Sequence, residues 1–183
     1  MKTVTLPVAY MPLVDAAPLI VAQDLGFAEA EGLALDLIAA PSWSSVRDML
    51  AFGRVDAAHM LSPVPVAMAL GLGGVTTSLS AVSVLSINGN VIGVGRPLEE
   101  RLRQTGYDFA FGDAAAAGKA LAAATGERLT VGVPFPFSMH VDLLHYWFEN
   151  TPLQGLEIDI RVVPPPLMAQ AIAAGEIDAF CVG

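Results

Sequence analysis

Short apolar segments alternate with helix-like patterns along the whole chain. Compact apolar runs predict strands at 3–9, 33–38, 57–61, 91–94, 129–133, 156–163 and 177–182. Apolar positions spaced three or four residues apart predict helices at 15–25, 44–52, 63–70, 97–104, 113–124, 139–149 and 166–174. Because strands that alternate with helices are typical of β-α-β units, the pattern predicts an α/β fold with mainly parallel sheets flanked by helices.

Local signals place several of the boundaries. Asp15 is expected to be the N-cap of the first helix and Gly26 to end it, and Gly53 is expected to end the second helix. The segment 75–85 is rich in serine and β-branched residues and is expected to be extended. Residues 87–90 read Ile-Asn-Gly-Asn, which is a turn signal before the next strand.

An internal repeat predicts two similar lobes. Residues 32–37 (GLALDL) resemble 155–160 (GLEIDI), and 53–57 (GRVDA) resemble 175–179 (GEIDA) at nearly the same offset. Each copy follows a strand and a helix and has the order strand, proline-containing loop, helix, glycine, strand. The alternative is that unrelated β-α-β units share glycine helix ends and Asp-Ala turns. The predicted lobes are 1–88 and 89–183.

Composition and charge exclude several classes of protein. The chain has 183 residues, of which 54% are hydrophobic and 15% charged, so it can bury a core and is not disordered. No apolar run approaches the length of a membrane span, so no transmembrane segment is expected. The net charge of −9 and the absence of a basic stripe argue against direct nucleic-acid binding. Three arginines among glutamates at 96–103 indicate a solvated helix face, and Cys181, the single cysteine, is expected to be a buried strand residue.

The N-terminal segment does not resemble a secretory signal. One lysine precedes a strand-like segment that Pro7 and Pro12 interrupt, whereas a signal needs a continuous apolar run and a small-residue cleavage site. We therefore expect a cytoplasmic protein, or a periplasmic one if a signal has been removed.

Candidate binding residues lie where the predicted strands end. Ligands of open parallel sheets sit beyond the carboxyl ends of the strands, and two facing lobes would line a cleft with these loops. Trp43 starts a helix from a Ser-Trp-Ser segment, and its indole N–H suits an anion; the alternative is packing at a lobe edge. Asn90 beside Gly89 offers an amide or is a simple turn residue, and His140 serves either the ligand or the fold. Ser62 and Asp15 occupy two further strand ends.

Known catalytic and metal motifs are missing from the sequence. It has no glycine-rich phosphate loop, no zinc-protease or nucleophile-elbow motif and no cysteine–histidine cluster. His140 and His145 are five positions apart on one helix and point too far apart to share an ion, so neither a metal nor a cofactor is expected. His59, between alanine and methionine, is interpreted as a buried structural histidine, and Trp147 as a packing residue.

Several stretches together resemble the solute-binding proteins of nitrate, sulfonate and bicarbonate ABC transporters (NMT1/THI5-like), and most closely their nitrate-related, nitrate-sensor branch. The matching stretches are 12–19, 42–48, 56–63, 88–90 and 175–183. The resemblance implies a periplasmic-binding-protein fold of type II with two similar lobes, and an interlobe anion pocket in which Trp43, Gly89, Asn90 and His140 match ligand-contacting positions. It also implies that the return of the chain to the first lobe, with a basic ligand residue, is absent, so that the chain is C-terminally truncated.

The expected function is therefore binding of a small anion without catalysis. Nitrate or nitrite is expected first, with bicarbonate or sulfonate as other possibilities. The family implies an ABC-transporter permease as partner, or, for cytoplasmic sensors, an RNA-binding antitermination regulator. Two alternatives stay open: an enzyme on the same fold, of the thiamine-pyrimidine or menaquinone-precursor type, and an interaction module without a ligand.

Overall fold

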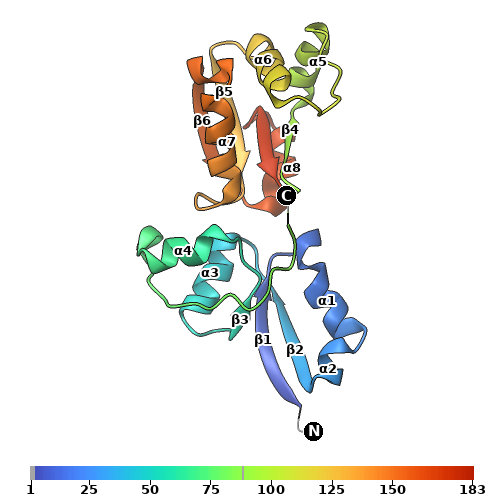
Figure 1. Ribbon diagram of the computed structural model, residues 1–183, viewed down its shortest axis with the longest axis vertical. Coiled ribbons are helices and arrows are strands. Elements are labelled where there is room, and N and C mark those ends of the chain that lie inside the picture. The colour runs from blue at the N-terminus through green and yellow to red at the C-terminus, as the bar shows by residue number, and fades with distance from the viewer. Residues whose placement is uncertain (1–2, 88) are drawn as a thin grey trace. The chain divides into compact units, whose positions relative to one another are not determined.

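The computed structural model describes residues 3–87 and 89–183, which form two compact units, Met1–Gly89 and Asn90–Gly183 (Figure 1). We call them unit 1 and unit 2. The turn expected at 87–90 includes Asn88, which lies outside the described residues. In the part of the chain that is described, none of the helices is long and apolar enough to cross a membrane.

Unit 1 is built on a parallel sheet in the order β2-β1-β3. Its strands are β1 (Val4–Tyr10), β2 (Leu33–Ala39) and β3 (Ala57–Ala58). Its helices are α1 (Ala17–Asp24), α2 (Phe27–Ala30), α3 (Trp43–Ala51) and α4 (Pro63–Ala69), with 3-10 turns η1 (Val14–Ala16) and η2 (Leu72–Gly74). Helices α1 and α2 pack near β2, and α3 packs against β1 and β3.

Unit 2 contains a four-stranded sheet in the order β4-β7-β5-β6, in which only β4 runs antiparallel. Its strands are β4 (Val91–Val94), β5 (Arg128–Val133), β6 (Glu157–Val162) and β7 (Ala179–Val182). Its helices are α5 (Arg96–Gln104), α6 (Ala114–Ala124), α7 (Met139–Glu149) and α8 (Pro165–Ala173), with the 3-10 turn η3 (Pro152–Gly155).

The same topology occurs in both units. In unit 1 the first strand of the motif lies between the second and the third, as β2-β1-β3, and in unit 2 the order β6-β5-β7 repeats this arrangement. The two repeated sequence segments fall on β2 and β6 and on the turns that lead into β3 and β7. The predicted α/β fold with mainly parallel sheets is therefore confirmed.

The core of unit 2 follows the alternation of β5. Leu129, Val131 and Val133 are fully buried in one cluster with residues of α7 and β7. Gly132 points to the other face, where a Cβ atom would lie 2.6 Å from Ile177 Cδ1 and 2.8 Å from Met168 Sδ. The glycine thus leaves the room that these two side chains occupy against the sheet.

Some sequence predictions need correction. Asp15 is not a helix N-cap, because the chain first forms η1, whose N-cap is Leu13, and α1 then begins after Ala16. The strand expected at 57–61 is only the two-residue β3.

Other expectations are confirmed by the structure. The arginines of α5 form the solvated face, in which Arg103 pairs with Glu99 at 2.7 Å and Arg96 with Glu100 at 3.5 Å. Cys181 is a buried free thiol in β7.

Candidate functional site

The strand ends of unit 1 bring together residues that are far apart in the sequence. Tyr10 at the end of β1 is level with Ala39 at the end of β2, and Ala9 is level with Ala58 at the end of β3. The segments that leave these three ends carry Asp15, Trp43, and His59 with Ser62. The sheet register therefore places all four at one edge of unit 1.

Trp43 is held at the first position of α3. Ser42 is the N-cap residue, and its hydroxyl accepts a hydrogen bond from the Ser45 backbone N–H at 3.1 Å. Trp43 is only 2% exposed, and its ring meets that of His59 edge-on, with centroids 5.1 Å apart and an interplanar angle of 67°. Trp43 is thus the first residue of α3, and its indole is buried within unit 1.

His59 connects Trp43 to Asp15. The backbone N–H of His59 donates to the carbonyl of Ala9 at 2.9 Å, which fixes the residue beyond β3. Its Nε2 lies 3.3 Å from Asp15 Oδ2. We call these three residues the Asp15–His59–Trp43 cluster.

Two buried polar atoms of the cluster form no hydrogen bond with the described residues. Within residues 3–87 and 89–183, neither Trp43 Nε1 nor His59 Nδ1 has a hydrogen-bond partner, although both atoms are buried. Buried polar groups are nearly always hydrogen-bonded, so these two atoms leave hydrogen-bonding capacity open in one cluster.

Ser62 and Gly89 contribute less to this edge. Ser62 is exposed and makes no side-chain cap to α4, and no recorded contact in the described residues joins it to the cluster. Gly89 is exposed with φ of 100°, a backbone region in which side-chain-bearing residues are strained.

Unit 2 brings Asn90 and His140 together. Because β4 runs antiparallel to β7 with Val91 opposite Val182, Asn90 lies beside Gly183, at the carboxyl end of β7. His140 is the second residue of α7 and is 5% exposed. A Cβ atom on Gly183 would lie 3.9 Å from Asn90 Oδ1 and 3.9 Å from His140 Nε2. The two predicted residues thus converge on one strand end.

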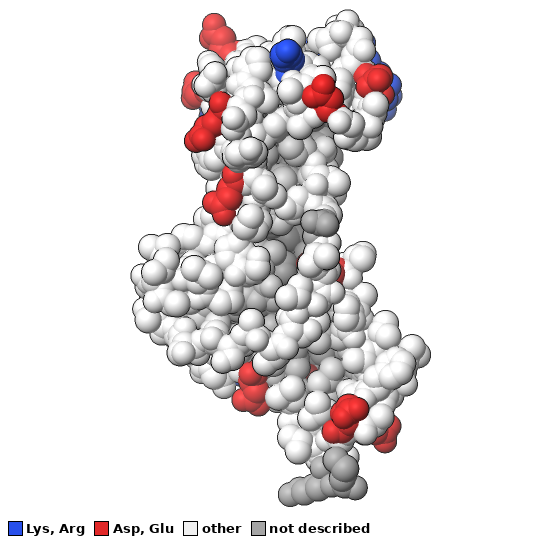
Figure 2. Space-filling model, viewed as in Figure 1, with Lys and Arg blue, Asp and Glu red and all other residues white. Residues whose placement is uncertain are grey.

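The described loops at the strand ends of unit 1 and unit 2 contain no Lys or Arg. Among the described residues, the segments between each of these strand ends and the following helix contain no Lys or Arg. One of these segments carries His59, and His140 lies at the start of α7. Arg47 of α3 pairs with Asp48 at 2.7 Å. On the face in Figure 2, the Lys and Arg side chains gather on unit 2 near α5 and α6. Among the described residues of these loops and the first turn of α7, the two histidines are the side chains that can carry positive charge.

The two sets bring together side chains that can donate hydrogen bonds. An indole N–H, an amide and two imidazoles can hold an oxyanion by hydrogen bonds. No group of three or more metal-binding side chains exists among the residues described, and no nucleophile is recorded against His59 Nδ1. The arrangement offers hydrogen-bonding groups at both strand ends, together with the contact between the Asp15 carboxylate and the His59 ring.

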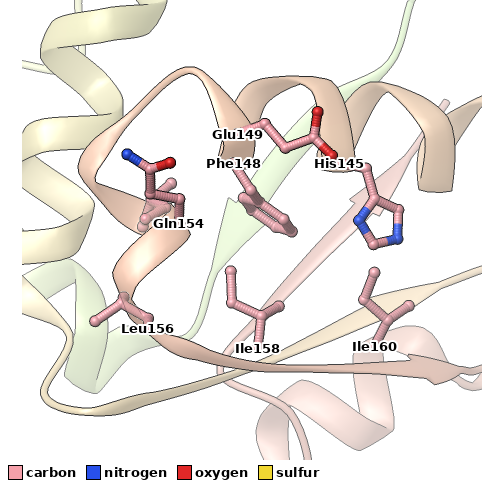
Figure 3. Close-up of a pocket in the computed structure, with 8 residues that line it drawn as sticks. His145, Phe148, Glu149, Gln154, Leu156, Ile158 and Ile160 are labelled. Carbon is pink, nitrogen blue, oxygen red and sulfur yellow. The ribbon is translucent and has the colours of Figure 1, made fainter.

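A separate groove lies between α7 and β6 of unit 2 and has a volume of about 440 Å³ (Figure 3). Phe148, Ile158 and Ile160 form its apolar lining, and His145 and Glu149 stand at its rim. No predicted site residue lines this groove.

The contacts of His59 with Asp15 and Trp43 are not part of its sequence interpretation. Its apolar sequence neighbours predict a buried histidine, and it is buried at 6% exposure. Its position directly after a parallel strand was the signal that could have found it, since the same rule selected Trp43 and Ser62.

Comparison with known proteins finds a matching family and several similar proteins. The whole chain, residues 1–183, matches the NMT1-like family. It is 33% identical over 186 residues to the nitrate import ATP-binding protein NrtC of Synechocystis sp., covering 100% of this chain and 27% of NrtC. It is 31% identical over 188 residues to the nitrate/nitrite binding protein NrtA of Nostoc sp., covering 100% of this chain and 41% of NrtA.

The crystal structure of the periplasmic nitrate-binding protein NrtA from Synechocystis PCC 6803 superposes with a TM-score of 0.80 at 28% identity, covering 100% of this chain and 47% of that one. The chain therefore spans less than half the length of these relatives. The fold is the α/β periplasmic-binding-protein fold of type II, as the resemblance implied. This chain belongs to the NMT1-like family.

Proposed function

We propose that this chain binds a small oxyanion, with nitrate or nitrite as the preferred class, and does so without catalysis. The observation that carries the proposal is the placement of Trp43, Asn90 and His140 at strand ends, where the Trp43 indole N–H is buried without a protein partner among the described residues. The similarity to NrtA, which binds nitrate and nitrite, supports the same ligand class.

The expected affinity is moderate. Nitrate has four heavy atoms, and a ceiling of about 1.5 kcal/mol per atom allows a binding free energy of about 6 kcal/mol. This corresponds to a dissociation constant of tens of micromolar. Because the strand-end loops lack Lys and Arg, hydrogen bonds and histidine charge must provide this energy.

The biological setting follows from the relatives. The import proteins NrtC and NrtA suggest that this chain serves the solute-binding side of an ABC import system, with a permease as partner and the periplasm as compartment. A cytoplasmic nitrate or nitrite sensor with an antitermination partner is the second setting that the family offers. An enzyme on the same fold is the alternative function, and histidine-dependent turnover of a candidate substrate would establish it.

The test is isothermal titration calorimetry with nitrate, nitrite and bicarbonate, and with chloride as the control anion. Saturable nitrate binding that Asn90→Ala weakens about tenfold is expected, since a hydrogen bond to a charged group contributes about 1.5–3 kcal/mol. Asn90 is exposed, so the variant should fold normally, and Gln104→Ala, which removes another exposed amide, serves as the matched control. Absence of binding by every oxyanion, in a cooperatively folded protein, would contradict the proposal.

A further inference from the structure

We propose that His59 is an anion-recognition residue that takes up a proton when a proton-free oxyanion binds, with Asp15 as its counterion and Trp43 as its neighbouring donor. This inference rests on the proposed function. It concerns the Asp15–His59–Trp43 cluster of unit 1.

The contact with Asp15 sets the tautomer of the neutral ring. Asp15 Oδ2 lies 3.3 Å from His59 Nε2, and a carboxylate accepts hydrogen bonds, so the Nε2 proton belongs to this contact. In the neutral ring, Nδ1 is then an acceptor. In the protonated ring, both nitrogens are donors and Asp15 balances the charge.

The unpartnered atoms of the cluster determine which ligand fits. Trp43 Nε1 is always a donor, whereas His59 Nδ1 is an acceptor or a donor according to the protonation of the ring. Neither atom has a hydrogen-bond partner in the described part of the chain, and the residues are 2% and 6% exposed. Nitrate and nitrite carry no proton, so a neutral Nδ1 would repel them, while a protonated Nδ1 offers a second donor beside the indole.

The charge around the cluster gives a second reason. The protein carries a net charge of −9, and the strand-end loops of unit 1 contain no Lys or Arg. An anion buried without a balancing charge is strongly disfavoured. Protonation of His59 supplies that charge.

Few other ionisable groups lie near His59. Asp15 from η1 is the charged side chain in recorded contact with it. The other ionisable side chains on the elements packed against His59, or next to them, are Tyr10, Arg47, Asp48 and Asp56. The 3.3 Å contact with His59 Nε2 makes the Asp15 carboxylate the counterion that the geometry assigns to His59.

The arrangement also predicts selectivity among oxyanions. Bicarbonate carries an O–H group and can donate it to a neutral Nδ1, so its binding needs no proton uptake. Nitrate binding that takes up a proton should instead weaken as the pH rises, by up to about tenfold per pH unit. Comparing nitrate with bicarbonate therefore distinguishes a general effect of charge on anion binding from proton uptake by His59.

The experiment is calorimetry of nitrate binding at several pH values between 6 and 8, in buffers that differ in ionisation enthalpy, which reports protons taken up per anion. The wild-type protein is expected to take up as much as one proton per nitrate, and His59→Gln to bind weakly with no uptake. His145→Gln, which removes an exposed histidine outside the cluster, should keep the uptake. Asp15→Asn, at a partly exposed position, should weaken binding at pH 6 about tenfold and reduce the uptake, and it provides a second test if His59→Gln fails to fold.

The outcomes are distinguishable. Nitrate binding without proton uptake, or uptake that persists in His59→Gln and disappears in His140→Gln, would overturn this inference and leave the proposed function standing. Failure of every oxyanion to bind the folded wild-type protein would overturn both.

Discussion

Replacing Trp43 by phenylalanine separates its role in binding from its role in packing. Trp43 is 2% exposed, so Trp43→Ala would remove a large buried side chain at a cost of about 3–5 kcal/mol and would confuse a binding test with a folding defect. Phenylalanine keeps an aromatic ring against His59, whose centroid lies 5.1 Å from that of Trp43, and removes only the N–H donor and part of the ring.

The two effects of this change on stability oppose each other. The smaller ring buries less apolar surface, which costs about 1 kcal/mol. The lost indole N–H has no hydrogen-bond partner in residues 3–87 and 89–183, so its removal returns the desolvation penalty of about 1–3 kcal/mol. The free energy of unfolding of Trp43→Phe should therefore stay within about 2 kcal/mol of the wild-type value.

The effect on anion binding should be larger and of one sign. A hydrogen bond to a charged group contributes about 1.5–3 kcal/mol, so nitrate affinity should fall by about 10- to 150-fold. Guanidinium denaturation followed by circular dichroism measures the stability, and calorimetry measures the affinity of the same preparations. A variant that loses more than 3 kcal/mol of stability while binding nitrate as well as the wild type would refute the assignment and make Trp43 a packing residue.

Three further predictions concern unit 2. Gly132→Ala places a methyl group 2.6 Å from Ile177 Cδ1, so chemical denaturation should show a loss of about 1–3 kcal/mol that becomes smaller in an Ile177→Val background; additive effects would contradict the packing described. The Arg128 and Arg161 guanidiniums hold the pKa of Asp159 below its usual value of 3.8, so the stability from this network is present above that value and is lost as the pH falls below it. Acid unfolding of Asp159→Asn should accordingly depend less on pH below about 4 than that of the wild type, and equal dependence would count against the network. Burial raises the pKa of Cys181 to about 11, so the native thiol should react with Ellman's reagent at pH 8 far more slowly than the unfolded thiol, and equal rates would show that β7 is open.

Local patterns were sufficient for most elements of the fold. The bounds of α7, Met139–Glu149, match the predicted 139–149, because apolar spacing and a preceding serine define that helix within one stretch of sequence. The start of α1 could not be predicted in the same way. Asp15 looks like an N-cap in isolation, but η1 intervenes, and its carboxylate lies against His59.

Contacts between distant segments explain what the sequence could not predict. The pairing of Asp15 with His59 depends on β1 and β3 lying side by side in register, and no short-range pattern records that register. The convergence of Asn90 and His140 on Gly183 likewise requires β4 to run antiparallel to β7. The resemblance gave Asn90 and His140 as ligand-contacting positions, and the structure places both near Gly183. Ser62, by contrast, has no side-chain contact with the cluster among the described residues.

The most direct test of anion recognition follows the two indole N–H resonances of the protein by 15N NMR during a nitrate titration. Trp43 Nε1 has no hydrogen-bond partner in the described residues, whereas Trp147 Nε1 donates to the Ala114 carbonyl at 2.8 Å and provides an internal control. We predict that the Trp43 resonance shifts saturably, together with the side-chain amide of Asn90 and the ring of His140, while the Trp147 resonance stays in place. A Trp43 resonance that does not move at saturating nitrate, or that moves only as much as that of Trp147, would contradict the account.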